Sequence, residues 1–154
     1  RLWCDLPARV GAYTREEVSA AVGSVHPAIE IADSRYDDWL SVGLPSLIAD
    51  GAVSGAFVTG EGRPWSSSMN LVDWSVMIRA DGEVVGEGQG SAALGDPVSS
   101  LLWLTNKLRQ LGSGLKAGDI VTTGTCTGNY QAGLDVCVVA DFGELGEVKV
   151  QFTP

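Results

Sequence analysis

Glycine punctuates this chain and restricts it to short elements of secondary structure. Twenty of the 154 residues are glycine, about twice the average share, which indicates many turns. Between the glycines lie short apolar runs, one of which alternates Trp74, Val76 and Ile78 with its neighbours as strand residues do. The Asp81-Gly82 pair is typical of a tight hairpin turn. We therefore expect strands at residues 28–32, 52–59, 71–79, 83–86, 120–123, 135–142 and 147–152.

Two helices have clear signals at their amino ends. Thr14 and Glu17 form a capping box, which predicts a helix that runs to about residue 22. Asp96 before Pro97 is an N-cap followed by proline at the first helical position. This second helix carries an apolar stripe that we interpret as core or oligomer contact, made of Leu101, Leu104, Leu108 and Leu111. A third, short helix is expected over residues 35–40.

The charge balance and the cysteines exclude several classes of protein. The chain has 10 Lys and Arg against 19 Asp and Glu, a net charge of −9, which argues against binding a nucleic-acid backbone. No apolar run approaches the ~20 residues that a bilayer span needs. Cysteines at positions 4, 126 and 137 form no metal-ligand or redox spacing. We therefore expect reduced thiols in a cytoplasmic protein.

The single histidine narrows the chemistry that an enzyme with this sequence can use. His26 lies next to Pro27, and we interpret it as a hydrogen-bonding loop residue rather than a base. The sequence has no Gly-x-Ser-x-Gly motif to supply a serine nucleophile beside it. Catalysis must then rest on carboxylates, hydroxyls, backbone amides or a metal, and no individual catalytic residue is assigned.

Glu30 places a carboxylate inside the apolar strand expected at residues 28–32. Burying an unpaired carboxylate costs several kcal/mol, so Glu30 needs a partner. A hard divalent cation and an ion pair with Arg35 or another basic residue are both open. Asp33 and Arg35 are two residues apart and are expected to form a salt bridge, with a substrate carboxylate as the alternative partner of Arg35.

Residues 116–128 run from an expected strand into a loop rich in glycine and threonine. The amides and hydroxyls of such a loop converge on an anion or oxyanion, or else form an ordinary turn capped by threonines. Cys126 lies in this loop without a cationic neighbour, and we expect a small buried thiol there.

Three segments together resemble the hydratase/decarboxylase branch of the fumarylacetoacetate hydrolase superfamily, namely residues 27–35, 48–60 and 117–128. The resemblance implies an α+β, strand-dominated fold, a mixed β-sandwich roll with two or three short helices. It also implies bound Mg²⁺ or Mn²⁺ and a homo-oligomer, in some cases complexed with the sister hydratase or decarboxylase. The implied activity is that of a lyase in meta-cleavage aromatic catabolism. Such an enzyme hydrates 2-hydroxypenta-2,4-dienoate to 4-hydroxy-2-oxopentanoate or decarboxylates 2-oxo-3-hexenedioate through a metal-stabilised dienolate.

The resemblance assigns roles to individual residues. Glu30 corresponds to one of three acids that hold the metal in the family, whereas the other two, a Glu-x-Glu pair, have no counterpart in this sequence. The candidate substrate-binding residues are Thr123, Gly124, Thr125, Asp50, Ser54 and Arg35. Gly51 and Val53 stand where relatives tend to have an Asn and hydroxyl residues, so polar contacts of that loop are lost.

Residues 1–154 are thus expected to form a single catalytic-type domain, the carboxyl-terminal part of a longer family chain. Two alternatives remain. In the first, the chain is a non-catalytic or truncated relative that acts as a structural partner subunit. In the second, it is a related hydrolase or decarboxylase of another small oxo-acid.

Overall fold

The computed structural model describes residues 1–153, most of whose ordered elements are short strands. Helix α3 (Pro97–Gln110) has 14 residues, whereas α1 (Arg15–Ala20) and α2 (Leu44–Ala49) have six each. Two 3₁₀ turns are η1 (Gly90–Ala92) and η2 (Gly143–Leu145). The strands are β1 (Ser24–Val25), β2 (Ala28–Ala32), β3 (Ser54–Thr59), β4 (Arg63–Pro64), β5 (Ser75–Ala80), β6 (Glu83–Gln89), β7 (Cys137–Asp141) and β8 (Glu147–Gln151). The expected α+β, strand-dominated class with a few short helices is confirmed.

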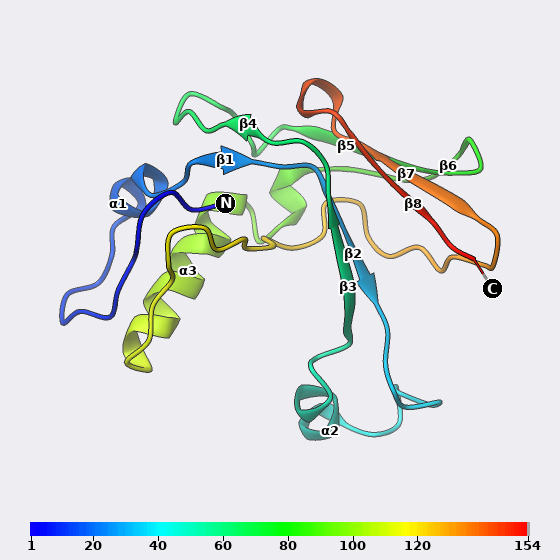
Figure 1. Cartoon of the computed structure of the whole chain (residues 1–154), viewed down its shortest axis with the longest axis horizontal. Coiled ribbons are helices and arrows are strands. Elements are labelled where there is room, and N and C mark those ends of the chain that lie inside the picture. Colours follow the sequence, from blue (N-terminus) through cyan, green and yellow to red (C-terminus); the bar gives the residue numbers. More distant parts are fainter. Residues whose placement is uncertain (154) are drawn as a thin grey trace.

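Three small sheets make up the framework. The largest has four strands in the order β6-β5-β7-β8, and the β2–β3 and β1–β4 pairs form the other two. Every pairing within residues 1–153 is antiparallel, rather than of both kinds as a mixed roll implies. In Figure 1 the β2–β3 ribbon extends away from the rest of the molecule and ends in the segment that carries α2. Both of its strands contact β8 at its other end.

The turn between β5 and β6 forms as its sequence predicts. Asp81 has a φ of 48° and Gly82 a φ of 90°, the two positive values that an Asp-Gly hairpin turn requires. The Asp81 carboxylate also accepts a hydrogen bond of 3.0 Å from the backbone N–H of Cys137, where β7 begins. This turn therefore fixes the start of the neighbouring strand as well.

Two sequence expectations about local structure are wrong. Residues 35–40 form turns instead of a helix, because Asp50 and the Ser34 hydroxyl accept hydrogen bonds from the first two backbone amides of that segment. Residues 120–123 have no strand partner among the described residues and run as an irregular segment. Helix α2 was not predicted, since the residue before it is Gly43 with a φ of 78° and no side-chain cap.

The main apolar core lies between helices α1 and α3. Helix α1 packs on α3, and Val18 between them is fully buried. The buried members of this core are Leu2, Leu6, Tyr13, Val18, Ala21, Leu101 and Leu115. The leucine stripe of α3 is core only in part, because Leu101 is 6% exposed and Leu111 is 69% exposed. None of the described helices is both long and apolar enough to span a membrane.

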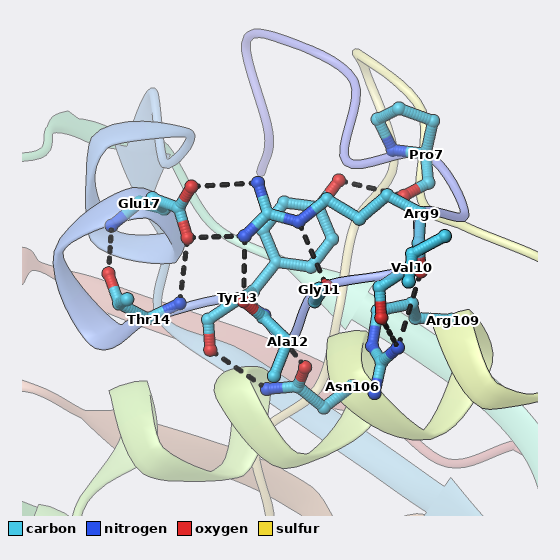
Figure 2. A network of polar contacts seen from close by, with 10 residues as sticks. All are labelled: Pro7, Arg9, Val10, Gly11, Ala12, Tyr13, Thr14, Glu17, Asn106 and Arg109. Carbon is cyan, nitrogen blue, oxygen red and sulfur yellow. Dashed lines mark hydrogen bonds and ion pairs between the residues drawn. The ribbon is translucent and has the colours of Figure 1, made fainter.

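A polar network fixes the loop before α1 (Figure 2). The Arg9 guanidinium lies 3.7 Å from the centre of the Tyr13 ring and donates two hydrogen bonds to Glu17. Asn106 of α3 bonds both the N–H and the C=O of Tyr13, at 2.9 and 3.1 Å. Arg109 donates to two further carbonyls of the loop. The loop is thereby attached to both helices, and it supports the core without reaching the cavity described next.

Candidate functional site

A cavity of about 280 Å³ lies where the β1–β2 path, the start of α3, the four-stranded sheet and residues 119–127 meet. The last of these segments is the irregular one between α3 and β7, which crosses the middle of the molecule in Figure 1. Apolar side chains cover most of its wall and include Leu71, Val76, Ile78, Leu101 and Phe142. Polar groups enter it from β1–β2 and from residues 119–127. An apolar pocket with a few converging polar groups is the usual form of a small-molecule site.

The β1–β2 path supplies the first polar wall. Ser24, His26 and Glu30 line the cavity, and their apolar neighbours Val25, Ala28 and Ile29 line it as well. Glu30 lies opposite Phe57 of β3 and is exposed, so the burial expected for its carboxylate is wrong. No described residue forms a hydrogen bond or ion pair with the Glu30 carboxylate. It therefore presents free oxygen lone pairs to the cavity.

The glycine–threonine loop supplies the second wall, through residues 122–127. The Thr125 hydroxyl donates to the Gly128 carbonyl at 3.1 Å and accepts from the Gly128 N–H at 3.1 Å. The threonine-capped turn is thus present, and the loop also faces the cavity. Gly124 has a φ of 117°, a conformation that favours glycine. The burial of Cys126 raises the pKa of its thiol, in agreement with an unreactive residue.

Strand β6 lies directly behind this loop. A Cβ atom on Gly88 would fall 1.9 Å from the Cys126 carbonyl oxygen, and one on Gly86 would fall 3.3 Å from the Thr127 carbonyl. Glycine is therefore required at position 88 because the two backbones touch there. The alternating glycines of β6 are a sequence signal for this contact, and they were interpreted only as turns and strand residues.

The remaining candidate residues gather outside the cavity, at the far end of the β2–β3 ribbon. The Asp50 side chain is only 5% exposed and forms an ion pair with Arg35. It also accepts a hydrogen bond of 3.0 Å from the Ser34 hydroxyl. The expected pairing of Arg35 with Asp33 or Glu30 is therefore wrong, because Asp50 takes its place. Ser54 begins β3 opposite Ala32 and likewise does not line the cavity.

The Asp50 carboxyl is held in its charged form by its own neighbours. Burial acts to raise its pKa, but hydrogen bonds from Arg35 and Ser34 outweigh that effect and lower the pKa below the usual value. The charged form is thus stabilised by its own neighbours and holds the turn at residues 33–36 against the end of α2. A role of Asp50, Ser54 and Arg35 in substrate binding stays a prediction.

His26 is a hydrogen-bonding residue, as predicted, but its place in the cavity was not. Its Nε2 lies 2.8 Å from the Ser24 hydroxyl and its Nδ1 lies 3.2 Å from the Gly60 carbonyl. A Cβ on Gly62 would fall 2.2 Å from the ring, so the imidazole packs directly on that backbone. No local pattern signals this placement, because His26 and Pro27 lie between β1 and β2.

The described residues supply only part of a metal site. Among residues 1–153, no three His, Cys, Asp or Glu side chains lie together as a candidate cation site. The cavity contains two carboxylates, Glu30 and Asp119, and the Asp119 carboxylate already accepts a 2.8 Å hydrogen bond from the Lys116 N–H. Glu30 fits as one oxygen ligand of a hard cation, and further ligands are not found in this part of the chain.

The chain is similar to known proteins along almost its whole length. The family model of the fumarylacetoacetate (FAA) hydrolase C-terminal region matches residues 7–152. A 2-hydroxyhexa-2,4-dienoate hydratase of Comamonas testosteroni is 33% identical over 140 residues, 91% of this chain and 53% of that protein. A 4-oxalocrotonate decarboxylase of Pseudomonas putida is 34% identical over 136 residues, 88% of this chain and 51% of the relative.

A solved structure agrees with these sequence relatives. The 4-oxalocrotonate decarboxylase of Pseudomonas putida G7, complexed with magnesium and adipate, superposes with a TM-score of 0.85 at 33% identity. The match covers 98% of this chain and 57% of the decarboxylase. A structure of the same decarboxylase with calcium and acetate superposes with a TM-score of 0.81. The chain therefore spans about half the length of the relatives that it matches.

Proposed function

The chain belongs to the fumarylacetoacetate hydrolase C-terminal family, as its three motif segments predicted, and from this we propose that it performs the lyase chemistry of the family's hydratases and decarboxylases. The substrate is a small oxo- or hydroxy-dienoate. The reaction is hydration of 2-hydroxypenta-2,4-dienoate to 4-hydroxy-2-oxopentanoate or decarboxylation of 2-oxo-3-hexenedioate. The observation that carries the proposal is that Glu30 and residues 122–127 line the same cavity.

The cavity wall suits both ends of such a substrate. The Thr123 to Thr125 stretch offers backbone amides and hydroxyls for the polar carboxylate end. Val76, Ile78 and Phe57 offer an apolar surface for the unsaturated carbon chain. The cavity thus suits a planar, largely apolar acid.

The proposal includes a divalent cation, Mg²⁺ or Mn²⁺, for which Glu30 is one ligand. Its other ligands would be carboxylates outside the described residues, because this part of the chain supplies no further free carboxylate in the cavity. A bound cation of this type supplies Lewis-acid stabilisation of negative charge on the substrate's oxygen atoms. The related decarboxylase structures contain magnesium or calcium, which supports this choice of ion.

A turnover assay of the full natural protein in Mg²⁺ tests the proposal. The two substrates are offered separately, and products are identified by NMR as 4-hydroxy-2-oxopentanoate or as carbon dioxide with the dienol. We expect turnover of one of them. Thr125→Val should lower kcat/KM by about tenfold or more, because a hydrogen bond to a charged group contributes about 1.5–3 kcal/mol. Thr153→Val, the same change at an exposed residue outside the cavity, serves as the control and keeps the wild-type rate. Absence of turnover with both substrates contradicts the proposal.

A second candidate function is supported by the incomplete set of metal ligands. In this alternative the chain is a non-catalytic partner subunit that retains the fold and the oligomer surface. It predicts no turnover by the protein alone and a gain of activity when it is mixed with a sister hydratase or decarboxylase. A related hydrolase of another small oxo-acid is distinguished by a panel of such acids.

We also propose that the protein is a cytoplasmic homo-oligomer. Its three cysteines, all within the described residues, are free thiols, which fits a reducing compartment. The segment at the end of the β2–β3 ribbon exposes apolar side chains, with Leu40 77%, Leu44 69% and Ile48 61% exposed. Such patches mark interaction surfaces. Light scattering of wild type and Leu44→Glu is the test. We expect the wild type to be an oligomer and the variant to be a smaller species. A monomeric wild type contradicts the proposal.

A further inference from the structure

The imidazole of His26 is held in one orientation by three neighbours. Its Nδ1 lies 3.2 Å from the Gly60 carbonyl, which only accepts hydrogen bonds, so we assign the ring proton to Nδ1. Nε2 is then an acceptor, and the Ser24 hydroxyl at 2.8 Å donates to it. The ring also packs on the backbone of Gly62. The arrangement has a defined direction, in which the Ser24 proton points to a nitrogen that can accept it.

This pair belongs to the wall of the cavity and is separated from Glu30 along the strand. Both Ser24 and His26 line the cavity, as Glu30 does. Four residues of extended chain place His26 about 13 Å from Glu30 at their Cα atoms. A substrate whose carboxylate end lies among Glu30 and the threonine loop therefore extends its unsaturated end toward Ser24 and His26.

We propose that Ser24 and His26 form the general base that activates water for addition to the substrate's unsaturated end. The inference rests on the proposed function and selects hydration as its reaction. The reacting form is the ketonised substrate, 2-oxopent-3-enoate. The water oxygen forms a bond to C4 as its proton passes to the Ser24 oxygen, and the Ser24 proton passes to Nε2 of His26. The C3–C4 π electrons move to give the C2–C3 enolate. The imidazolium then returns its proton through Ser24, and the enolate is protonated at C3, so the sum is addition of one water.

The chemistry favours this role over binding of a second carboxylate. With its proton donated to His26, the Ser24 oxygen presents only lone pairs to the cavity. Lone pairs accept a proton from water but repel the distal carboxylate of a dicarboxylic substrate. A base must lie within hydrogen-bond reach of the proton that it takes, and a clamped Ser–His pair meets that condition for a water at the wall.

The test uses the full natural protein in Mg²⁺ with 2-hydroxypenta-2,4-dienoate, and follows 4-hydroxy-2-oxopentanoate by NMR. His26→Gln keeps an acceptor for the Ser24 hydroxyl but cannot hold a proton. We expect its kcat for water addition to fall about 100-fold or more, the usual contribution of a general base, with KM changed less than about threefold. His26→Gly leaves a space for free imidazole, which should restore at least a tenth of the lost rate. A purely structural histidine would not be restored in this way.

Ser24→Ala is the second variant, because it retains the bond between His26 and Gly60, and the exposed Ser41→Ala is its matched control. Equal thermal melts establish that each variant is folded. An active wild type whose His26→Gln and Ser24→Ala variants both add water within threefold of its rate overturns the inference alone. So does a wild type that only decarboxylates. A wild type without turnover of either dienoate refutes the proposed function, and the inference with it.

Discussion

Substitution of Asp96 by alanine should destabilise the protein by removing the polar contact between helices α1 and α3. Asp96 is the N-cap of α3, and its carboxylate accepts a 2.9 Å hydrogen bond from the Val98 N–H. It also forms an ion pair with Arg15, the first residue of α1, and accepts a 3.2 Å bond from the Ser99 hydroxyl. The first turn of α3 lines the cavity, so this contact connects helix stability to the shape of the site.

The expected cost has two parts. Loss of an Asp N-cap costs about 1 kcal/mol. The ion pair is partly exposed, with Asp96 at 15% and Arg15 at 46% of side-chain exposure, so it contributes ~0.5–1 kcal/mol. Asp96→Ala should therefore lower the free energy of unfolding by about 2 kcal/mol. Asp96→Asn keeps a good cap and loses only the charge, so we expect about half that loss.

The assay is urea unfolding followed by fluorescence of the five tryptophans, with melting temperature as a second measure. For a chain of this size, Asp96→Ala should lower Tm by about 4–8 °C. Arg15→Met, which retains most of the side-chain stem, should cost about as much as Asp96→Asn. The reasoning would be refuted if Asp96→Ala lost less than about 0.5 kcal/mol of unfolding free energy while the slope of that free energy against urea concentration stayed unchanged. Equal losses in Asp96→Asn and Asp96→Ala would refute it as well.

Three further predictions follow. Hydrogen bonds from Arg9 lower the pKa of Glu17 to about 2. The stabilisation of the folded state by this pair is therefore complete above the ordinary pKa of 4.5 and is lost as the pH falls from about 4.5 to 2. Urea midpoints across this range should fall more steeply for wild type than for Glu17→Gln. Gly88→Ala should cost ~1–3 kcal/mol by forcing β6 from Cys126, whereas Gly11→Ala, with open space at its Cβ, should cost less than about 0.5 kcal/mol in the same assay. Thiol titration with a disulfide reagent should find Cys126 slower to react than a free thiol, because burial raises its pKa; a rate equal to that of free cysteine contradicts this.

The fold was predictable wherever local chemistry determines the element. Strand β2 has the bounds that its apolar run predicts, and the Asp81-Gly82 turn and the Asp96 cap form as expected. Residues 120–123 were mistaken for a strand because β-branched residues favour extended backbone whether or not a partner strand is present. Pairing is a tertiary property that the local pattern does not contain.

The site was predictable in part. The sequence placed Glu30 and the threonine loop together only through a family resemblance, and the cavity that joins them depends on the path of residues 119–127 over β6. The position of His26 in the cavity has no local signal, because His26 and Pro27 lie between β1 and β2. The Asp50–Arg35 pair joins residues 15 positions apart, and no local pattern predicts such a contact.

Calorimetric titration of the full natural protein with Mn²⁺ tests most directly whether Glu30 is a metal ligand in the cavity. Glu30→Gln removes the charge with little change of shape, and Glu83→Gln makes the same change at an exposed strand position outside the cavity. We predict saturable binding by wild type and Glu83→Gln that is lost in Glu30→Gln. Wild-type affinity in Glu30→Gln, or no binding by wild type at millimolar Mn²⁺, would contradict the account.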